Sequence, residues 1–168
     1  MDPQPMIDVT SAVSSAPLPA GLLSRELQQL WFSLDAHRWS SLLIVPAPGV
    51  TGALPLAIGL LHVSRRSSPE SRSSLLDGTG VALEQVAALV QSIATRVGQR
   101  ERVLVVVDPV EENPAALALA SCCDAALLCV SLGRSDLDSA RDTLERCGRA
   151  RFLGSVALVP RRRRRRGP

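Results

Sequence analysis

A proline- and glycine-rich loop between two apolar segments has the spacing of a phosphate-binding loop but lacks its reactive side chains. Residues 42–61 read LLIVPAPGVTGALPLAIGLL, which predicts a strand, a tight loop and then a helix. The working motif, G-x-x-x-x-G-K-[ST], holds phosphate with backbone N–H groups and a lysine, and Mg²⁺ with a hydroxyl group. Here Gly52 stands at the lysine position and Ala53 at the hydroxyl position. The sequence contains no lysine at all, so no neighbour could supply the missing ammonium group.

A carboxylate that could complete such a site follows the apolar run RVLVVV at residues 102–107. Asp108 is expected at the carboxyl end of a buried strand, where ligands bind in open α/β sheets. Without the lysine and the hydroxyl group, we predict that Asp108 does not hold Mg-ATP and instead serves as a turn or capping carboxylate. Glycines at the helix start could still present N–H groups to an anion. The vestigial nucleotide loop is predicted at Pro48, Gly49, Thr51, Gly52, Ala53 and Asp108, with no catalytic residue and no cofactor.

Cysteine and histidine spacing predicts no metal site. The cysteines are Cys122, Cys123, Cys129 and Cys147, and the histidines are His37 and His62. No C-x-x-C pair occurs among them, so the spacing of a zinc site is absent. The first residues also lack the apolar core of a secretory signal. We therefore expect reduced, buried thiols in a cytoplasmic protein.

An uncharged run at residues 42–63 raises the alternative of a membrane span. It is 22 residues long, with Trp39 before it and Arg65 and Arg66 after it. Pro46 and Pro48 argue against a spanning helix, because they would break it and leave backbone carbonyls unsatisfied in lipid. We therefore predict a strand, a loop and a helix here, and no membrane span.

Apolar periodicity predicts an alternation of helices and strands along the rest of the chain. Helices are expected at residues 22–34, from about residue 54, at residues 81–97 and at residues 136–147. A further short helix is expected with Asn113 as its N-cap and Pro114 at its first position. Thr79 and Ser135 are the expected N-caps of the helices at 81–97 and 136–147. Strands are expected at residues 41–45, 102–107, 125–131 and 151–159. The polar, turn-rich residues 64–78 are predicted to form a surface loop.

This pattern indicates one α/β domain with a doubly wound, mostly parallel sheet and right-handed crossovers. The domain is predicted at residues 21–160, after a flexible arm at 1–20 and before a disordered poly-arginine tail at 161–168. The six tail arginines carry twice the chain's net charge of +3, so residues 1–160 carry a net charge of −3. The folded body is therefore mildly acidic, and its charge does not favour nucleic acid as a partner.

Four segments resemble the cytoplasmic domains of bacterial tyrosine kinases, a MinD/ParA-like branch of the P-loop NTPases. The segment from Arg25 to Leu34 is similar to the family's leading helix, F-R-x-L-R-T-N-L-x-F-S. Residues 41–61 resemble the degenerate form of its Walker A-type loop, and VLVVVDP at 103–109 resembles its acidic strand Y-V-I-I-D-T-P-P. Residues 123–159 resemble the closing segments of the family, with Asp124 and Gly133 at matching places.

The departures from the family bear on activity. Gly52 and Ala53 replace the catalytic lysine and the Mg²⁺ hydroxyl, and no tyrosine exists to be autophosphorylated. The family's second acidic strand, I-D-x-D-x-R-x-P, has no evident counterpart, because only the polar segment around Arg65, Arg66 and Pro69 stands there. The resemblance therefore implies the fold of the family and a non-catalytic, pseudokinase-like member of it, so we predict that the chain is not an enzyme.

The resemblance also implies a role and partners. The family acts in capsule and exopolysaccharide synthesis, so the implied role is a regulatory or scaffolding one in that synthesis and export. The implied partner is a membrane-bound polysaccharide co-polymerase, an active paralogue or another copy of the chain, which would bring the protein to the inner face of the membrane. The alternatives are a MinD/ParA-like positioning protein, a weak nucleotide binder with residual ATPase activity, or a polyanion binder acting through the arginine tail.

The leading helix is the candidate interaction surface, through Arg25, Glu26, Trp31 and Phe32. Apolar residues recur along it with helical spacing, which predicts one face on the core. Neighbouring residues on a helix lie about 100° apart, so Trp31 and Phe32 cannot both face that core. We therefore expect one ring in the core and the other at least partly exposed, where aromatic side chains favour contacts with partners.

Overall fold

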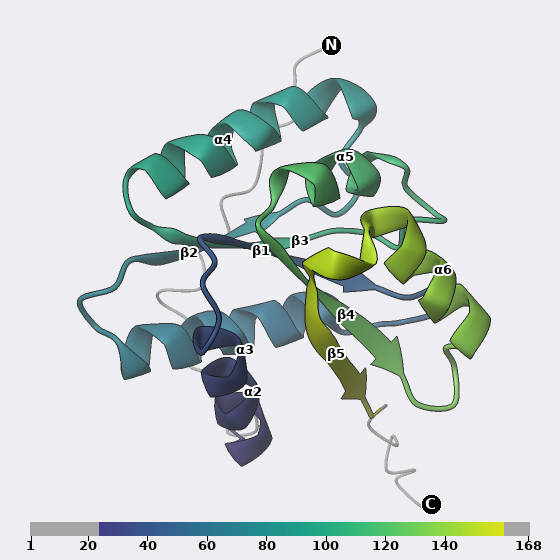
Figure 1. Ribbon diagram of the computed structural model, residues 1–168, viewed down its shortest axis with the longest axis horizontal. Helices are drawn as coiled ribbons and strands as arrows, with labels where there is room; N and C mark the ends of the chain where they lie inside the picture. The colour runs from purple at the N-terminus through teal and green to yellow at the C-terminus, as the bar shows by residue number, and fades with distance from the viewer. Residues whose placement is uncertain (1–23, 160–168) are drawn as a thin grey trace, which may run out of the picture.

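The computed structural model describes residues 24–159, which form a five-stranded, all-parallel sheet with helices on both faces (Figure 1). The strand order is β2-β3-β1-β4-β5. The elements are α2 (Arg25–Asp35), β1 (Ser41–Pro46), α3 (Ala53–Ser67), β2 (Ser73–Asp77), the 3₁₀ turn η1 (Leu83–Gln85), α4 (Val86–Gly98), β3 (Arg102–Val106), α5 (Ala115–Cys122), β4 (Ala125–Ser131), α6 (Leu137–Cys147), the 3₁₀ turn η2 (Arg149–Arg151) and β5 (Phe152–Leu158). The predicted arm at 1–20 and tail at 161–168 lie outside the described residues.

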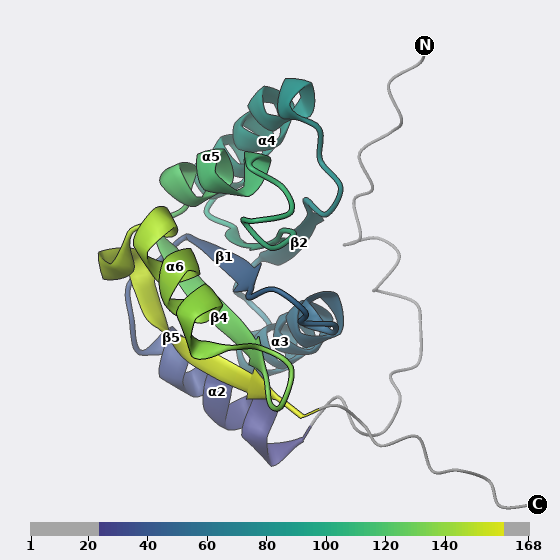
Figure 2. The ribbon, with the colours of Figure 1, turned by 90° about the vertical axis from the view of Figure 1, so that its right-hand side faces the viewer.

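Each central strand is apolar on both faces, and helices cover both faces of the sheet. Leu42 and Ile44 of β1 pack toward α2 and α3, whereas Leu43 and Val45 pack toward α4 and α5. The helix α6 lies with α4 and α5, over β4 (Figure 2). All four of these β1 side chains are fully buried, and each contributes about 1.5–3 kcal/mol relative to exposure. The prediction of a doubly wound parallel sheet is therefore confirmed.

The predicted surface loop at residues 64–78 is wrong in two places. Residues 64–67 complete α3, and residues 73–77 form β2, an edge strand that pairs with β3 in parallel. Ser64 and Ser73 are buried, and their hydroxyl oxygens lie 2.6 Å apart in a hydrogen bond. Each hydroxyl group provides the other's hydrogen-bond partner, so both serines can be buried. The buried segment is therefore polar in sequence, and no apolar run indicates that it forms a strand. The strand depends on Leu75 and Leu76 alone for its apolar contacts.

Two predicted helix caps are also wrong. Thr79 does not cap a helix, since its N–H and hydroxyl both donate to the carboxylate of Asp77, and α4 begins only after η1. Asp136, rather than Ser135, caps α6 by accepting from the N–H of Ser139 at 2.7 Å. The hydroxyl of Ser135 instead accepts from the N–H of Ser131 at 3.0 Å, which closes the turn after β4.

Gly78 provides a test of how closely β2, β3 and α4 approach one another. Its N–H donates to the carbonyl of Val106 at 2.8 Å, and an added Cβ would lie 3.0 Å from that carbonyl and 3.1 Å from Leu89 Cδ2. We expect Gly78→Ala to lower the free energy of unfolding by about 1–3 kcal/mol through overpacking. The matched control is Gly98→Ala at the end of α4, where no atom lies within 4 Å of the added Cβ. Urea denaturation should show the control unchanged or slightly stabilised; equal losses in both would contradict the close approach.

Candidate functional site

The vestigial loop joins β1 to α3 at the carboxyl edge of the sheet and is tied to the neighbouring strand. The N–H of Ala47 donates to the carbonyl of Cys129 at 2.8 Å, and the N–H of Val50 donates back to Ala47 at 3.1 Å. The hydroxyl of Ser135 lies 3.4 Å from the carbonyl of Pro48. The loop is thus closed on itself and against β4, while Gly49 and Thr51 at its tip are exposed.

The loop departs from a working phosphate loop in its backbone as well as in its side chains. Gly52, at the lysine position, caps α3 with φ 118° and ψ 9°, a left-handed conformation. Residues with a Cβ rarely adopt it, so a lysine here would be strained. Ala53, at the hydroxyl position, is buried and offers no oxygen to a metal ion. The two groups that hold β- and γ-phosphate and Mg²⁺ are therefore both absent from the site.

Asp108 lies directly after β3 at the same edge of the sheet and is occupied by structural hydrogen bonds. Its Oδ2 accepts from the N–H of Gly80 at 2.6 Å and from Asn113 Nδ2 at 3.1 Å. The same amide nitrogen of Asn113 donates to the carbonyl of Val81, and its Oδ1 accepts from the N–H of Ala115. Asp108 therefore ties the loop after β2 to the start of α5, which matches the interpretation as a turn carboxylate.

A second carboxylate, Asp77, was missed by the sequence analysis. It ends β2, and its backbone aligns with Val106 of β3, at the carboxyl edge of the sheet. Asp77 accepts from the N–H of Thr79 at 3.0 Å and from its hydroxyl at 2.7 Å. The Asp-Gly pair that follows Leu75 and Leu76 was the available signal, because it is typical of a turn after a strand.

The thiols and acidic groups of the described residues lie apart from one another or are buried. Within residues 24–159, no three His, Cys, Asp or Glu side chains gather in a way that could hold a metal ion. Burial raises the pKa of Cys123 and of Cys129 to about 12 each, so both stay protonated at neutral pH. Cys147 is buried as expected, but Cys122 at the end of α5 is exposed, which corrects the prediction that all four are buried. None of the helices in this part of the chain is long and apolar enough to cross a membrane.

The candidate interaction helix α2 has one face on the core and one on the surface. Trp31 is 2% exposed and Phe32 is 57% exposed, which confirms the prediction for the two rings. Arg25 and Glu26 are both exposed in the first turn. The pKa of Glu26 is lowered by a hydrogen bond from the Glu26 backbone N–H and by one from Ser24.

A cluster at the amino edge of the sheet holds α2 in place. The indole N–H of Trp39 donates to the carbonyl of Leu34 at 2.8 Å, and the ring meets Trp31 edge-on with centroids 6.0 Å apart. The guanidinium of Arg102, from the start of β3, lies 4.7 Å from the Trp39 ring centroid and pairs with Asp35. The exposed side of α2 is thus presented by a fixed helix.

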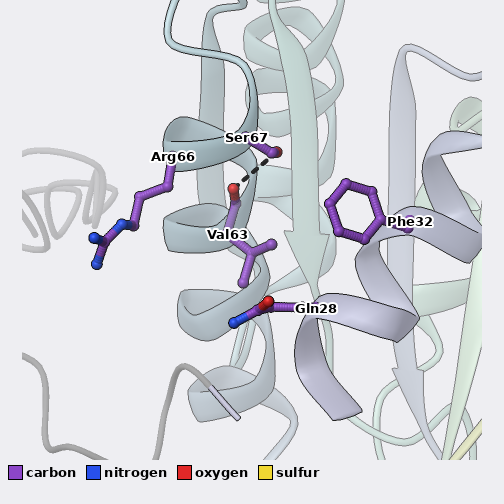
Figure 3. A pocket seen from close by; sticks show the side chains of 5 residues that line it. All are labelled: Gln28, Phe32, Val63, Arg66 and Ser67. Atoms are coloured by element: carbon purple, nitrogen blue, oxygen red, sulfur yellow. Dashed lines mark hydrogen bonds between the residues drawn. The ribbon is translucent and has the colours of Figure 1, made fainter. Parts of the chain in front are cut away.

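The exposed ring of Phe32 lines a groove of about 370 Å³ between α2 and α3. Figure 3 shows Phe32 and Gln28 of α2 across from Val63 and Ser67 of α3, with Arg66 directed away from the Phe32 ring. The hydroxyl of Ser67 donates to the carbonyl of Val63 at 2.9 Å within α3. The groove therefore combines an aromatic ring, an apolar side chain and a nearby positive charge.

Comparison with known proteins supports the fold. No family model and no curated protein matches the sequence. The structure is similar to the kinase domain of the Escherichia coli tyrosine kinase ETK, with a TM-score of 0.64 and 13% identity over 79% of this chain and 73% of that chain. It is also similar to the chimerical protein CapA2B2, with a TM-score of 0.64 and 12% identity over 89% of this chain and 88% of that chain. At these identities the similarity establishes the fold alone, a P-loop NTPase-like α/β fold.

The structural role of Asp108 can be tested by stability. We expect Asp108→Ala to lower the free energy of unfolding by about 1–3 kcal/mol, because the Gly80 N–H and the Asn113 amide would each lose an acceptor. Glu111→Ala, at an exposed carboxylate of the same loop, should stay within about 0.5 kcal/mol of the parent. Chemical denaturation measures both variants. An Asp108 variant as stable as the Glu111 variant would show that the carboxylate does not hold the loop.

Proposed function

We propose that this chain is a non-catalytic, pseudokinase-like P-loop domain that acts as a regulatory or scaffolding partner in exopolysaccharide or capsule synthesis and export. The observation that carries the proposal is the left-handed glycine at the lysine position, followed by buried Ala53. A domain that keeps this fold without the lysine and the hydroxyl ligand has lost the groups that stabilise a transferring phosphoryl group. What remains for it is recognition of another protein.

The partner would bind at α2 and the groove beside it. Phe32 is a large exposed ring on a helix fixed to the core by Trp31, Trp39 and Arg102, so binding would order few side chains. The partner class proposed is a membrane-bound polysaccharide co-polymerase, an active kinase paralogue or another copy of this chain. Such a partner would place the protein at the inner face of the membrane. Genes for glycosyltransferases and a chain-length regulator beside this one would support this role, and a division or partitioning context would favour a MinD/ParA-like positioning role.

Nucleotide should leave the protein unaffected. A ligand that binds only the folded state raises the melting temperature at concentrations well above its Kd. Because the lysine and the hydroxyl ligand are both missing, we expect no melting shift with millimolar ATP and Mg²⁺ and no ATP turnover above the background of Asp108→Ala. A clear upward shift, or a turnover that disappears in Asp108→Ala, would instead favour a weak nucleotide binder with residual ATPase activity.

Phe32→Ala should separate binding from folding. We expect it to leave the free energy of unfolding within about 1 kcal/mol of the parent, because the ring is mostly exposed. It should weaken binding to the co-polymerase or paralogue, or self-association, by roughly 1–3 kcal/mol. The control is Trp31→Ala, which should cost about 3–5 kcal/mol of stability because that ring is buried. Calorimetric titration measures binding to the partner, and sedimentation measures self-association. If Phe32→Ala changes neither affinity, α2 is not the partner surface.

A further inference from the structure

The helix α6 begins with an exposed leucine between two aspartates. Leu137 is 85% exposed, more than any other large apolar side chain in the described part of the chain, and Asp136 and Asp138 beside it are also exposed. Hydrogen bonds from the backbone N–H and the hydroxyl of Ser139 lower the pKa of Asp136, so its carboxylate is charged at neutral pH. Arg141 follows only one turn later. The first turn of α6 therefore presents an apolar side chain flanked by negative charge.

The groove between α2 and α3 has the complementary pattern. Phe32 and Val63 give it an apolar lining, and its volume of about 370 Å³ exceeds that of one leucine side chain. The helix α3 contains no acidic residue and carries Arg65 and Arg66 in its last turn. Arg66 lines the groove and pairs with no carboxylate among the described residues. The groove thus has room for an apolar side chain beside a positive charge that no acidic group balances.

The other exposed aliphatic side chains of the described residues do not match the groove as well. Leu132 and Val159 have no acidic residue directly beside them, and Leu83 has only Glu84. Opposite charges placed around a contact favour the matched pair and disfavour the rest. Charge complementarity therefore selects Leu137 as the side chain that fits the groove.

The groove and the start of α6 belong to opposite faces of the sheet. The helices α2 and α3 pack on one face, and α6 packs on the other with α4 and α5 (Figures 1 and 2). Leu137 therefore cannot enter the groove of its own chain. One copy can, however, offer its groove to one neighbour and its Leu137 to another at the same time. Such a head-to-tail contact builds closed rings or open chains of copies.

We propose that the α2–α3 groove receives Leu137 of a second copy of this chain, with Asp136 and Asp138 of that copy beside Arg66. The side chain of Leu137 would lie against the ring of Phe32, so that two exposed apolar groups leave water together. The proposal rests on the function proposed above in that it uses the same groove. It adds which partner fills the groove and through which residues.

The first test measures self-association of the full chain by sedimentation at increasing concentration. We expect Leu137→Ser and Phe32→Ala each to weaken it by about tenfold or more, since each removes one side of the contact. The matched control is Leu83→Ser, at another exposed leucine, which should leave it unchanged. A mixture of Leu137→Ser with Phe32→Ala is the decisive sample. The first variant keeps its groove and the second keeps Leu137, so the mixture should form dimers with the affinity of the parent.

A charge exchange tests the pairing of the flanking groups. Arg66→Asp should weaken self-association by about tenfold or more, and Asp138→Arg in the same chain should restore it. Raising the salt concentration should weaken the parent but not abolish its association, because the apolar contact remains. No dimer in the mixture of variants, or equal losses in Leu137→Ser and Leu83→Ser, would overturn the proposal. A chain that stays monomeric, yet binds a co-polymerase or paralogue through Phe32, would overturn it and leave the proposed function standing.

Discussion

Burial of the central strands on both faces is the constraint from which the rest of the structure follows. Leu42 to Val45 are fully buried, and so are Val103, Val105 and Val106 of the adjacent strand, so helices must cover the sheet on each side. A parallel sheet covered in this way brings the carboxyl ends of its strands to one edge, where the loop after β1, Asp77 and Asp108 gather. The stability of the fold comes from this aliphatic core, so it does not depend on the loop at that edge.

Two carboxylates at that edge of the sheet organise the adjoining loops through hydrogen bonds. Asp108 accepts through Oδ2 from Gly80 and Asn113, and Asp77 accepts twice through Oδ1 from Thr79. The bonds of Thr79 and Gly80 fix the connection between β2 and α4, where α4 follows a 3₁₀ turn. The left-handed Gly52 begins α3 at the same edge of the sheet, and no lysine stands at this position.

Repeating apolar patterns in the sequence were sufficient to predict most strands and helices. Elements that depend on a single hydrogen bond were not predicted. The strands β1, β3 and β4 were predicted because long β-branched and leucine runs have no other stable place than a covered sheet. The strand β2 was missed, since Ser73 is buried only through its bond with Ser64, nine residues away. The cap of α6 fell one residue from the prediction because Ser135 and Asp136 can both cap, and only the fold engages Ser135 with Ser131. In the candidate site, residue types revealed the lost lysine, but only the backbone revealed that Gly52 is left-handed.

The helix α2 shows why an interaction surface is harder to predict than a core. Helical spacing was sufficient to predict that Trp31 and Phe32 face different ways, because this depends on neighbouring residues alone. The contacts that hold α2 come from Trp39 and Arg102, and the second of these is 67 residues from its partner Asp35. The ring and the guanidinium pack against α2 on its buried side, and they fix the part of the helix from which the exposed Phe32 projects. The position of α2 therefore depends on contacts of its buried side with Trp39 and Arg102. Such long-range contacts cannot be predicted from the local sequence of the helix.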